Sequence, residues 1–216
     1  MNSYVELTNT FRTNLWRTAG ARFYGARRLE LRDRLSTFSI AFLSVIAIGV
    51  GLLDPVIGSG DAPVLLRIGT AVLTTIISVF VLTISLIEGN SRSQLQATRL
   101  HESGVRLTEL RGSLEILTAQ SGDHPQWDSF EKLRNEYDRE IRECPFNHDP
   151  IDDLRFKIDH RSSDEFAAAD KRPQITWLRA VVIEARYVMS AAWLSVVSWV
   201  VVVGLVAAAV DWHHLA

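Results

Sequence analysis

The sequence holds a single cysteine, Cys144, which excludes an internal disulfide and any metal site built from several cysteines. Cys144 lies four residues before His148 in the polar stretch ECPFNHDP, and such a pair could in principle ligate a metal or form a Cys/His nucleophile. Two residues without further partners are a weak indication of either chemistry. We therefore expect a structural role for this pair, and we predict neither a metal ion nor a cofactor.

The chain also lacks the sequence motifs of the common enzyme classes. It contains no glycine-rich phosphate loop, no HExxH, no GxSxG and no kinase signature. The acidic residues of 88–186 lie mostly among arginines and lysines, as in EKLRNEYDREIRE, which is typical of a solvated helix face. We predict that the protein is not an enzyme.

Neither sign of charge is in large excess. The 23 basic and 25 acidic residues give a formal net charge of -2, which argues against a surface built to bind DNA or RNA. Any basic patch must be local, and we do not expect direct binding of nucleic acid.

Three long runs contain no Asp, Glu, Lys, Arg or His: Leu35–Leu53, Ile68–Ile87 and Tyr187–Val210. Each is close to the roughly 20 residues that carry a helix across about 30 Å of hydrocarbon, and none has a charged face to present to water. We predict an all-α membrane protein. Its long helices extend from two core transmembrane spans into a cytosolic helical bundle, and a third transmembrane helix lies near the C-terminus.

Arginines and lysines gather at one end of each run. They precede the first run, follow the second and precede the third, whereas the connection 54–67 and the tail DWHHLA together hold one arginine. The positive-inside rule then places the N-terminus in the cytosol and the C-terminus outside. The predicted order is a cytosolic amphipathic helix (1–34), transmembrane helix 1 (35–53), a short outer loop (54–67), transmembrane helix 2 (68–87), a cytosolic helical region (88–186), transmembrane helix 3 (187–210) and an outer tail (211–216).

The cytosolic parts read as helices with one apolar face. No Gly or Pro separates the N-terminal helix from the first span in ARRLELRDRLSTFSIAFL, which predicts one continuous helix. The second span is expected to continue through a leucine repeat at 100, 107 and 114, whose packing partner is either the N-terminal helix or another copy of the chain. A further helix is predicted over 127–143, followed by a structured turn and a short helix in PFNHDPIDDLRF.

The second span carries a stripe of hydroxyl groups. At 100° per residue, Thr70, Thr74, Ser78 and Ser85 fall within one quadrant of a helical wheel. Such a stripe could line a narrow polar path if several copies of the chain surrounded a common axis. The alternative is that these side chains bond back to the helix or pack small surfaces against a neighbouring helix.

The order of these segments resembles a known family. The stretches NLWRTAGARFYGARRLELRDRLSTFSIAFLSVIAI, ISLIEGNSRSQLQATRLHESGVRLTELRGSL and EYDREIRECPFNHDPIDDLRF are similar to the SLATT family, the SMODS and SLOG-associating two-transmembrane effector domains. The resemblance covers most of 12–158 and leaves the third span without a role. Phe146 and Asp153 depart from the residues frequent in the family, so the contacts of the turn are not fixed by it.

The resemblance implies a membrane effector of bacterial anti-phage systems that oligomerises, forms a pore or disrupts the inner membrane on activation, and causes growth arrest or cell death (abortive infection). The implied partners are the lipid bilayer, further copies of the chain, and a nucleotide-signal synthase, reverse transcriptase or other sensor. Two alternatives stay open: a non-conducting membrane scaffold or sensor that recruits a cytosolic partner, and, less favoured, a small transporter.

Within this hypothesis we assign two sets of residues. The hydroxyl stripe is the candidate pore lining. The candidate residues for coupling between the cytosolic part and the spans are Arg27, Arg28, Glu88, Asn147, His148 and Asp152. Simpler explanations exist for some of them, because arginines next to a span anchor it to anionic headgroups and Glu88 could pair with a nearby arginine such as Arg92.

Overall fold

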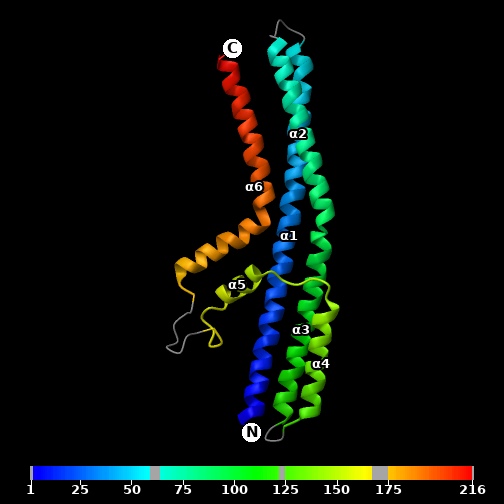
Figure 1. The fold of residues 1–216 in the computed structure, drawn as a ribbon, viewed down its shortest axis with the longest axis vertical. Coiled ribbons are helices and arrows are strands. Elements are labelled where there is room, and N and C mark those ends of the chain that lie inside the picture. Colours follow the sequence, from blue (N-terminus) through cyan, green and yellow to red (C-terminus); the bar gives the residue numbers. More distant parts are fainter. Residues whose placement is uncertain (1, 59–63, 122–124, 167–174, 216) are drawn as a thin grey trace. The chain divides into compact units, whose positions relative to one another are not determined.

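The computed structural model describes residues 2–58, 64–121, 125–166 and 175–215, with the backbone only at 2, 53–58, 64–70, 205, 206 and 208–215. These residues form helices and no strand (Figure 1), which confirms the all-α prediction. The helices are α1 (Asn2–Gly58), α2 (Val64–Ser91), α3 (Ser93–Ser121), α4 (Trp127–Glu143), α5 (Pro150–Asp159) and α6 (Trp177–Leu215).

Three helical stretches of the described chain are long and apolar enough to cross a membrane. Their uncharged runs lie in α1, α2 and α6. The protein is therefore a helical membrane protein, as the composition of these runs predicts. The ends of α1 and α2 occupy part of the segment 54–67 that we assigned to a loop, and residues 59–63 lie outside the described chain.

The chain divides into two compact units. Residues 1–30 and 94–190 form the first, here called the head unit, and residues 31–93 and 191–216 form the second, the span unit. Helix α1 contributes to both and runs without a break for 57 residues, which confirms the predicted continuous helix. The helix α6 is likewise shared between the two units.

The core of the head unit forms where the apolar faces of α1, α3 and α4 meet. Leu15 of α1 and Leu107 and Leu114 of α3 are fully buried in one cluster. Aromatic ring pairs connect α1 to α4; the ring centroids of Phe11 and Phe130 are 5.5 Å apart, and those of Phe11 and Tyr137 are 5.6 Å apart. The leucine repeat therefore packs on the N-terminal helix of its own chain, one of the two partners left open above.

Helix α2 does not continue into α3, so the prediction of one long helix is wrong at Arg92. This residue has a φ of 50°, in the left-handed region that non-glycine residues rarely adopt. The sequence EGNSRS before and after it is rich in residues with low helix propensity. The hydroxyls of Ser91 and Ser93 bond to each other across the break at 2.7 Å, which gives the two helix ends a local partner.

The span unit has its own apolar cluster. Leu43 of α1, Ile84 of α2, and Leu194 and Val202 of α6 are buried together. Small hydroxyl residues are buried there too, such as Ser39 and Ser198, and small side chains let membrane helices approach closely. The outward faces of these helices expose large apolar side chains, including those of Val45, Leu52, Val79 and Leu82, as a lipid-facing surface requires.

Two further predictions about the head unit hold. Helix α4 has the bounds Trp127–Glu143 given by its apolar stripe. A short helix, α5, follows the turn in PFNHDPIDDLRF and begins at Pro150, whose fixed φ suits the first helical position.

We predict that Leu107→Ala destabilises the protein by about 2–5 kcal/mol, because it leaves a cavity in a fully buried cluster. The matched control is Leu95→Ala, the same change at an exposed position of the same helix. Thermal unfolding in detergent, followed by circular dichroism, measures both variants. Equal midpoints for the two variants would contradict the packing described for the leucine repeat.

Candidate functional site

The turn before α5 places two carboxylates at the start of that helix. Asp149 is the residue before the helix, with extended backbone angles, and its N–H donates to Asp152 Oδ2 at 2.9 Å. Asp152 is fully buried. A carboxylate so far from water needs a partner of opposite charge, because isolated burial of a charge is strongly unfavourable.

That partner is Arg28, near the end of the α1 segment that belongs to the head unit. Its Nε donates to Asp152 Oδ1 at 2.8 Å and its Nη2 donates to Asp152 Oδ2 at 3.1 Å. Nη2 also bonds to Asp149. We call Arg28, Asp149 and Asp152 the clasp. Burial opposes the charge of Arg28, but the hydrogen bonds and charges of the two aspartates outweigh it and raise its pKa above the ordinary value.

Two glycines of α1 allow α5 to lie this close. A Cβ at Gly20 would collide with the ring of Phe156, and a Cβ at Gly25 would lie 3.0 Å from Asp152 Oδ2. The segment GARFYGARR thus leaves room for α5 on one face of α1. Arg17 adds a second ion pair to the same helix, with Nε 2.6 Å from Asp153 Oδ1. Asp153, which departs from the family pattern, therefore has a definite partner here.

Other predicted coupling residues lie near the clasp without joining it. Arg27 is exposed, and its guanidinium lies 5.6 Å from the centroid of the Tyr24 ring. Asn147 is exposed and accepts the N–H of His148 at 3.0 Å. The Nδ1 of His148 is buried without a hydrogen-bond partner. Burial lowers the pKa of His148, and the nearby Asp153 and Asp152 oppose that effect only in part.

Glu88, the sixth predicted coupling residue, belongs to the span unit. Its Oε1 accepts hydrogen bonds from Nη2 and Nε of Arg32, at 3.1 Å and 3.2 Å. The ion-pair partner found among the described residues is thus Arg32 of α1, and not Arg92. This pair joins the inner end of α2 to α1 within the span unit.

The hydroxyl stripe is only partly described. The side chain of Thr70 lies outside the described residues. Thr74 and Ser85 are half-buried, whereas Ser78 is exposed and donates to the carbonyl of Thr74 at 2.8 Å. The face of α2 that packs within the unit centres instead on Ile77 and Ile84. In a single chain Ser78 bonds back to its own helix, as the simpler alternative expects, and the lining role stays a prediction.

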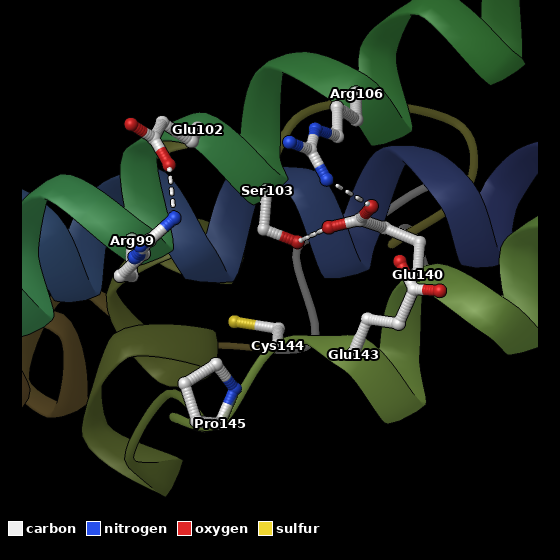
Figure 2. A pocket seen from close by; sticks show the side chains of 8 residues that line it. All are labelled: Arg99, Glu102, Ser103, Arg106, Glu140, Glu143, Cys144 and Pro145. Carbon is white, nitrogen blue, oxygen red and sulfur yellow. Dashed lines mark hydrogen bonds and ion pairs between the residues drawn. The ribbon is translucent and has the colours of Figure 1, made fainter.

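A second group of polar residues, not predicted from the sequence, joins three helices of the head unit. Arg22 of α1 donates to the hydroxyl of Ser103 on α3, and Ser103 in turn donates to Glu140 of α4. Arg106 donates to the other oxygen of Glu140 at 3.2 Å. Figure 2 shows Ser103 and Arg106 converging on the same carboxylate. We call these four residues the polar bridge; they connect α1, α3 and α4 at one level.

The polar bridge could have been found from spacing. Arg22 follows Leu15 and Ala19 at the three- and four-residue steps of the buried stripe, and Ser103 lies between Leu100 and Leu107. Glu140 similarly follows the apolar positions of α4. A polar residue on the apolar face of each of three helices indicates that the three meet and satisfy one another.

A pocket of about 270 Å³ opens beside the bridge (Figure 2). It is lined by Arg99, Glu102, Ser103, Arg106, Glu140, Glu143, Cys144 and Pro145. Arg99 pairs with Glu102 at 3.2 Å, and the half-buried thiol of Cys144 donates to the carbonyl of Phe146 at 3.2 Å. In the described part of the chain, no group of three or more His, Cys, Asp or Glu is placed to hold a metal ion.

Comparison with known proteins gives one match. The family model described as SMODS and SLOG-associating 2TM effector domain family 5 (SLATT_5) matches residues 6–208. The match extends beyond the range 12–158 and includes most of the third apolar run. Searches of curated proteins and of solved structures gave no match.

We predict that Arg28→Met destabilises the protein by about 3–5 kcal/mol, because it leaves the fully buried Asp152 without its charge partner. The double variant Arg28→Met/Asp152→Leu should recover much of that loss. Arg111→Met is the control, since its pair with Glu115 is exposed and worth about 0–1 kcal/mol. Detergent unfolding midpoints measure all three, and a double variant no better than the single one would argue against a buried pair.

The lowered pKa of His148 predicts a pH dependence. The unfolded chain binds a proton at this histidine more readily than the folded chain does, so stability is full above the ordinary pKa of 6.5 and falls as the pH drops below it. Lowering the pH from about 7.5 to about 5.5 should reduce the unfolding midpoint, and His148→Gln should reduce that dependence. His101→Gln, at an exposed histidine, should leave it unchanged. Parallel curves for wild type and His148→Gln would refute the assignment.

Proposed function

The chain belongs to SMODS and SLOG-associating 2TM effector domain family 5, a family of membrane effectors of anti-phage systems, and from this premise we propose how it acts. Several copies assemble in the bacterial inner membrane and, once activated, form a pore or disrupt the bilayer. The host cell then stops growing or dies, which limits the spread of the phage. No enzymatic step is assigned to the chain.

The observation that supports this mechanism is the continuity of α1. The clasp residue Arg28 and the first uncharged run, which starts at Leu35, lie on one unbroken helix. The two residues are seven positions apart, about 10 Å along the helix axis. A helix transmits displacement along its length, so a partner or ligand that opens the clasp moves or releases the first span.

In the resting protein the head unit holds the spans closed. The clasp fixes α5 to α1, and the polar bridge fixes α1 to α3 and α4. Each centres on a buried carboxylate, Asp152 or Glu140, with defined partners, so each has a discrete broken state rather than a continuous range of positions. The activating event is proposed to break the clasp, while the bridge keeps the remaining helices together.

The membrane orientation belongs to the same proposal. The distribution of arginine and lysine supports a cytosolic N-terminus, a cytosolic region 88–186 and an outer C-terminus. The head unit would then face the cytosol, where a nucleotide-signal synthase, a reverse transcriptase or another sensor could act on it. Residues 1–30 and 94–190 are the surface that such a partner would contact.

The proposed conducting path uses the hydroxyl stripe of α2. Ser78 lies exposed on the single chain, which leaves it available to the centre of an assembly. Its bond to the Thr74 carbonyl leaves the two lone pairs of the hydroxyl oxygen free to accept bonds from water. The uncharged runs carry no ionisable group for a proton-coupled or charged-substrate transporter, which counts against that alternative.

A leakage experiment tests this function against a non-conducting scaffold. We predict that phage infection of cells that express the protein collapses the membrane potential, reported by a voltage-sensitive dye, and that Thr74→Leu/Ser78→Leu reduces the collapse about tenfold by removing polar groups from the path. The control is Thr75→Leu/Thr83→Leu, which makes the same kind of change at exposed hydroxyls of α2 outside the stripe.

The outcomes separate the hypotheses. A scaffold leaves the potential intact in every variant. Leakage that both double variants reduce equally would contradict the lining assignment and leave the effector function standing. Size-exclusion profiles in detergent confirm that each variant keeps the assembly of the unsubstituted protein.

A further inference from the structure

The first turns of α6 are docked on the head unit by one face. Ala180, Ile183 and Tyr187 are buried, and the hydroxyl of Tyr187 donates to the carbonyl of Tyr24 at 2.8 Å. Glu184 pairs with Nε of Arg155 of α5 at 2.6 Å. These contacts fix how this segment is rotated about its own axis.

The opposite face of the same turns is apolar and exposed. The exposed fractions are 67% for Trp177, 70% for Leu178, 49% for Val181 and 57% for Val182. At 100° per residue the four fall within an arc of about 140°, and the next apolar residues of that arc, Val188 and Met189, are exposed as well. We call these six residues the apolar ridge. Contiguous apolar surface of this kind marks a contact with a protein or a membrane.

Charge and sequence favour the membrane over a protein. Arg179 and Arg186 are seven residues apart, are exposed, and lie along one edge of the apolar ridge. Exposed arginines bordering an apolar helix face are the pattern of helices that lie on anionic lipid. Trp177 is at the far end of the ridge, and tryptophan is enriched at the boundary between lipid and water.

Continuity supports the same occupant. The ridge is on α6, and its last two residues, Val188 and Met189, already belong to the uncharged run that starts at Tyr187. The ridge is therefore joined to a helix that itself enters the bilayer, and lipid is the neighbour that this position guarantees. Nothing in the position of the ridge requires a second copy of the chain beside it.

We propose that Trp177–Met189 is an interfacial segment. Its apolar ridge lies in the boundary between headgroups and acyl chains, and Arg179 and Arg186 bind the phosphates of anionic lipids. Because its buried face is docked on α1 and α5, the segment anchors the head unit to the membrane surface. This role does not depend on whether the protein conducts.

Fluorescence of the full chain in vesicles tests the proposal. Leu178→Cys in a Cys144→Ser background carries a polarity-sensitive dye, and Ile116→Cys, an exposed apolar position of α3, is the matched control. In vesicles of phosphatidylcholine and phosphatidylglycerol, the Leu178 label should be quenched several-fold more by spin-labelled lipid than the Ile116 label. Iodide in the buffer should quench the Ile116 label more. Arg179→Glu/Arg186→Glu should lower the lipid quenching at Leu178.

Three results would overturn it. Equal iodide quenching of both labels places the ridge in water, and a Leu178 label shielded from both quenchers places it against protein. The third is unchanged tryptophan quenching by brominated lipid in Trp177→Phe, measured in the chain that keeps Cys144. That last variant keeps the proposal testable if the cysteine replacement disturbs folding.

Discussion

The buried ion pair between Arg28 and Asp152 is the constraint on which the rest of the head unit depends. A buried carboxylate excludes every arrangement of α5 that does not bring the guanidinium of Arg28 to it. The close approach of α5 to α1 needs glycine at positions 20 and 25. It also determines the path of the turn that follows α4. The pair fixes the position of α5 on α1 more than it adds to the free energy of folding, because its electrostatic attraction is largely cancelled by the loss of hydration of the two charges.

The polar bridge has the complementary role. It lies beside the leucine packing of α1, α3 and α4, and apolar burial by itself is non-directional. Glu140 accepts bonds from two residues of α3, and only one register of the helices satisfies them. The head unit thus combines non-directional apolar burial with two polar arrangements that select a single alignment.

Composition and periodicity were enough to predict the helices, because each signal is local. The uncharged runs, the apolar stripe of α4 and the prolines flanking the turn each determine the conformation of residues close to them in the sequence. The break at Arg92 was not predicted, since no Gly or Pro marks that residue itself and its positive φ depends on how the two helix ends are held. Arg28 and Asp152 of the clasp were among the predicted coupling residues, but Asp149 was not, and the partners of Arg28 and Glu88 were not predicted. Those pairings join positions more than 50 residues apart, which local patterns cannot specify.

The left-handed residue between α2 and α3 has a mechanical consequence. Helices α1 and α6 each contribute residues to both units without an interruption of the helix. At Arg92 the helical conformation is interrupted, so α2 and α3 are two separate helices. The rotation of the span that bears the hydroxyl stripe is therefore set by the contacts of α2 within its own unit, the packing of Ile84 and the ion pair between Glu88 and Arg32, and these contacts decide which side chains α2 presents to a shared axis.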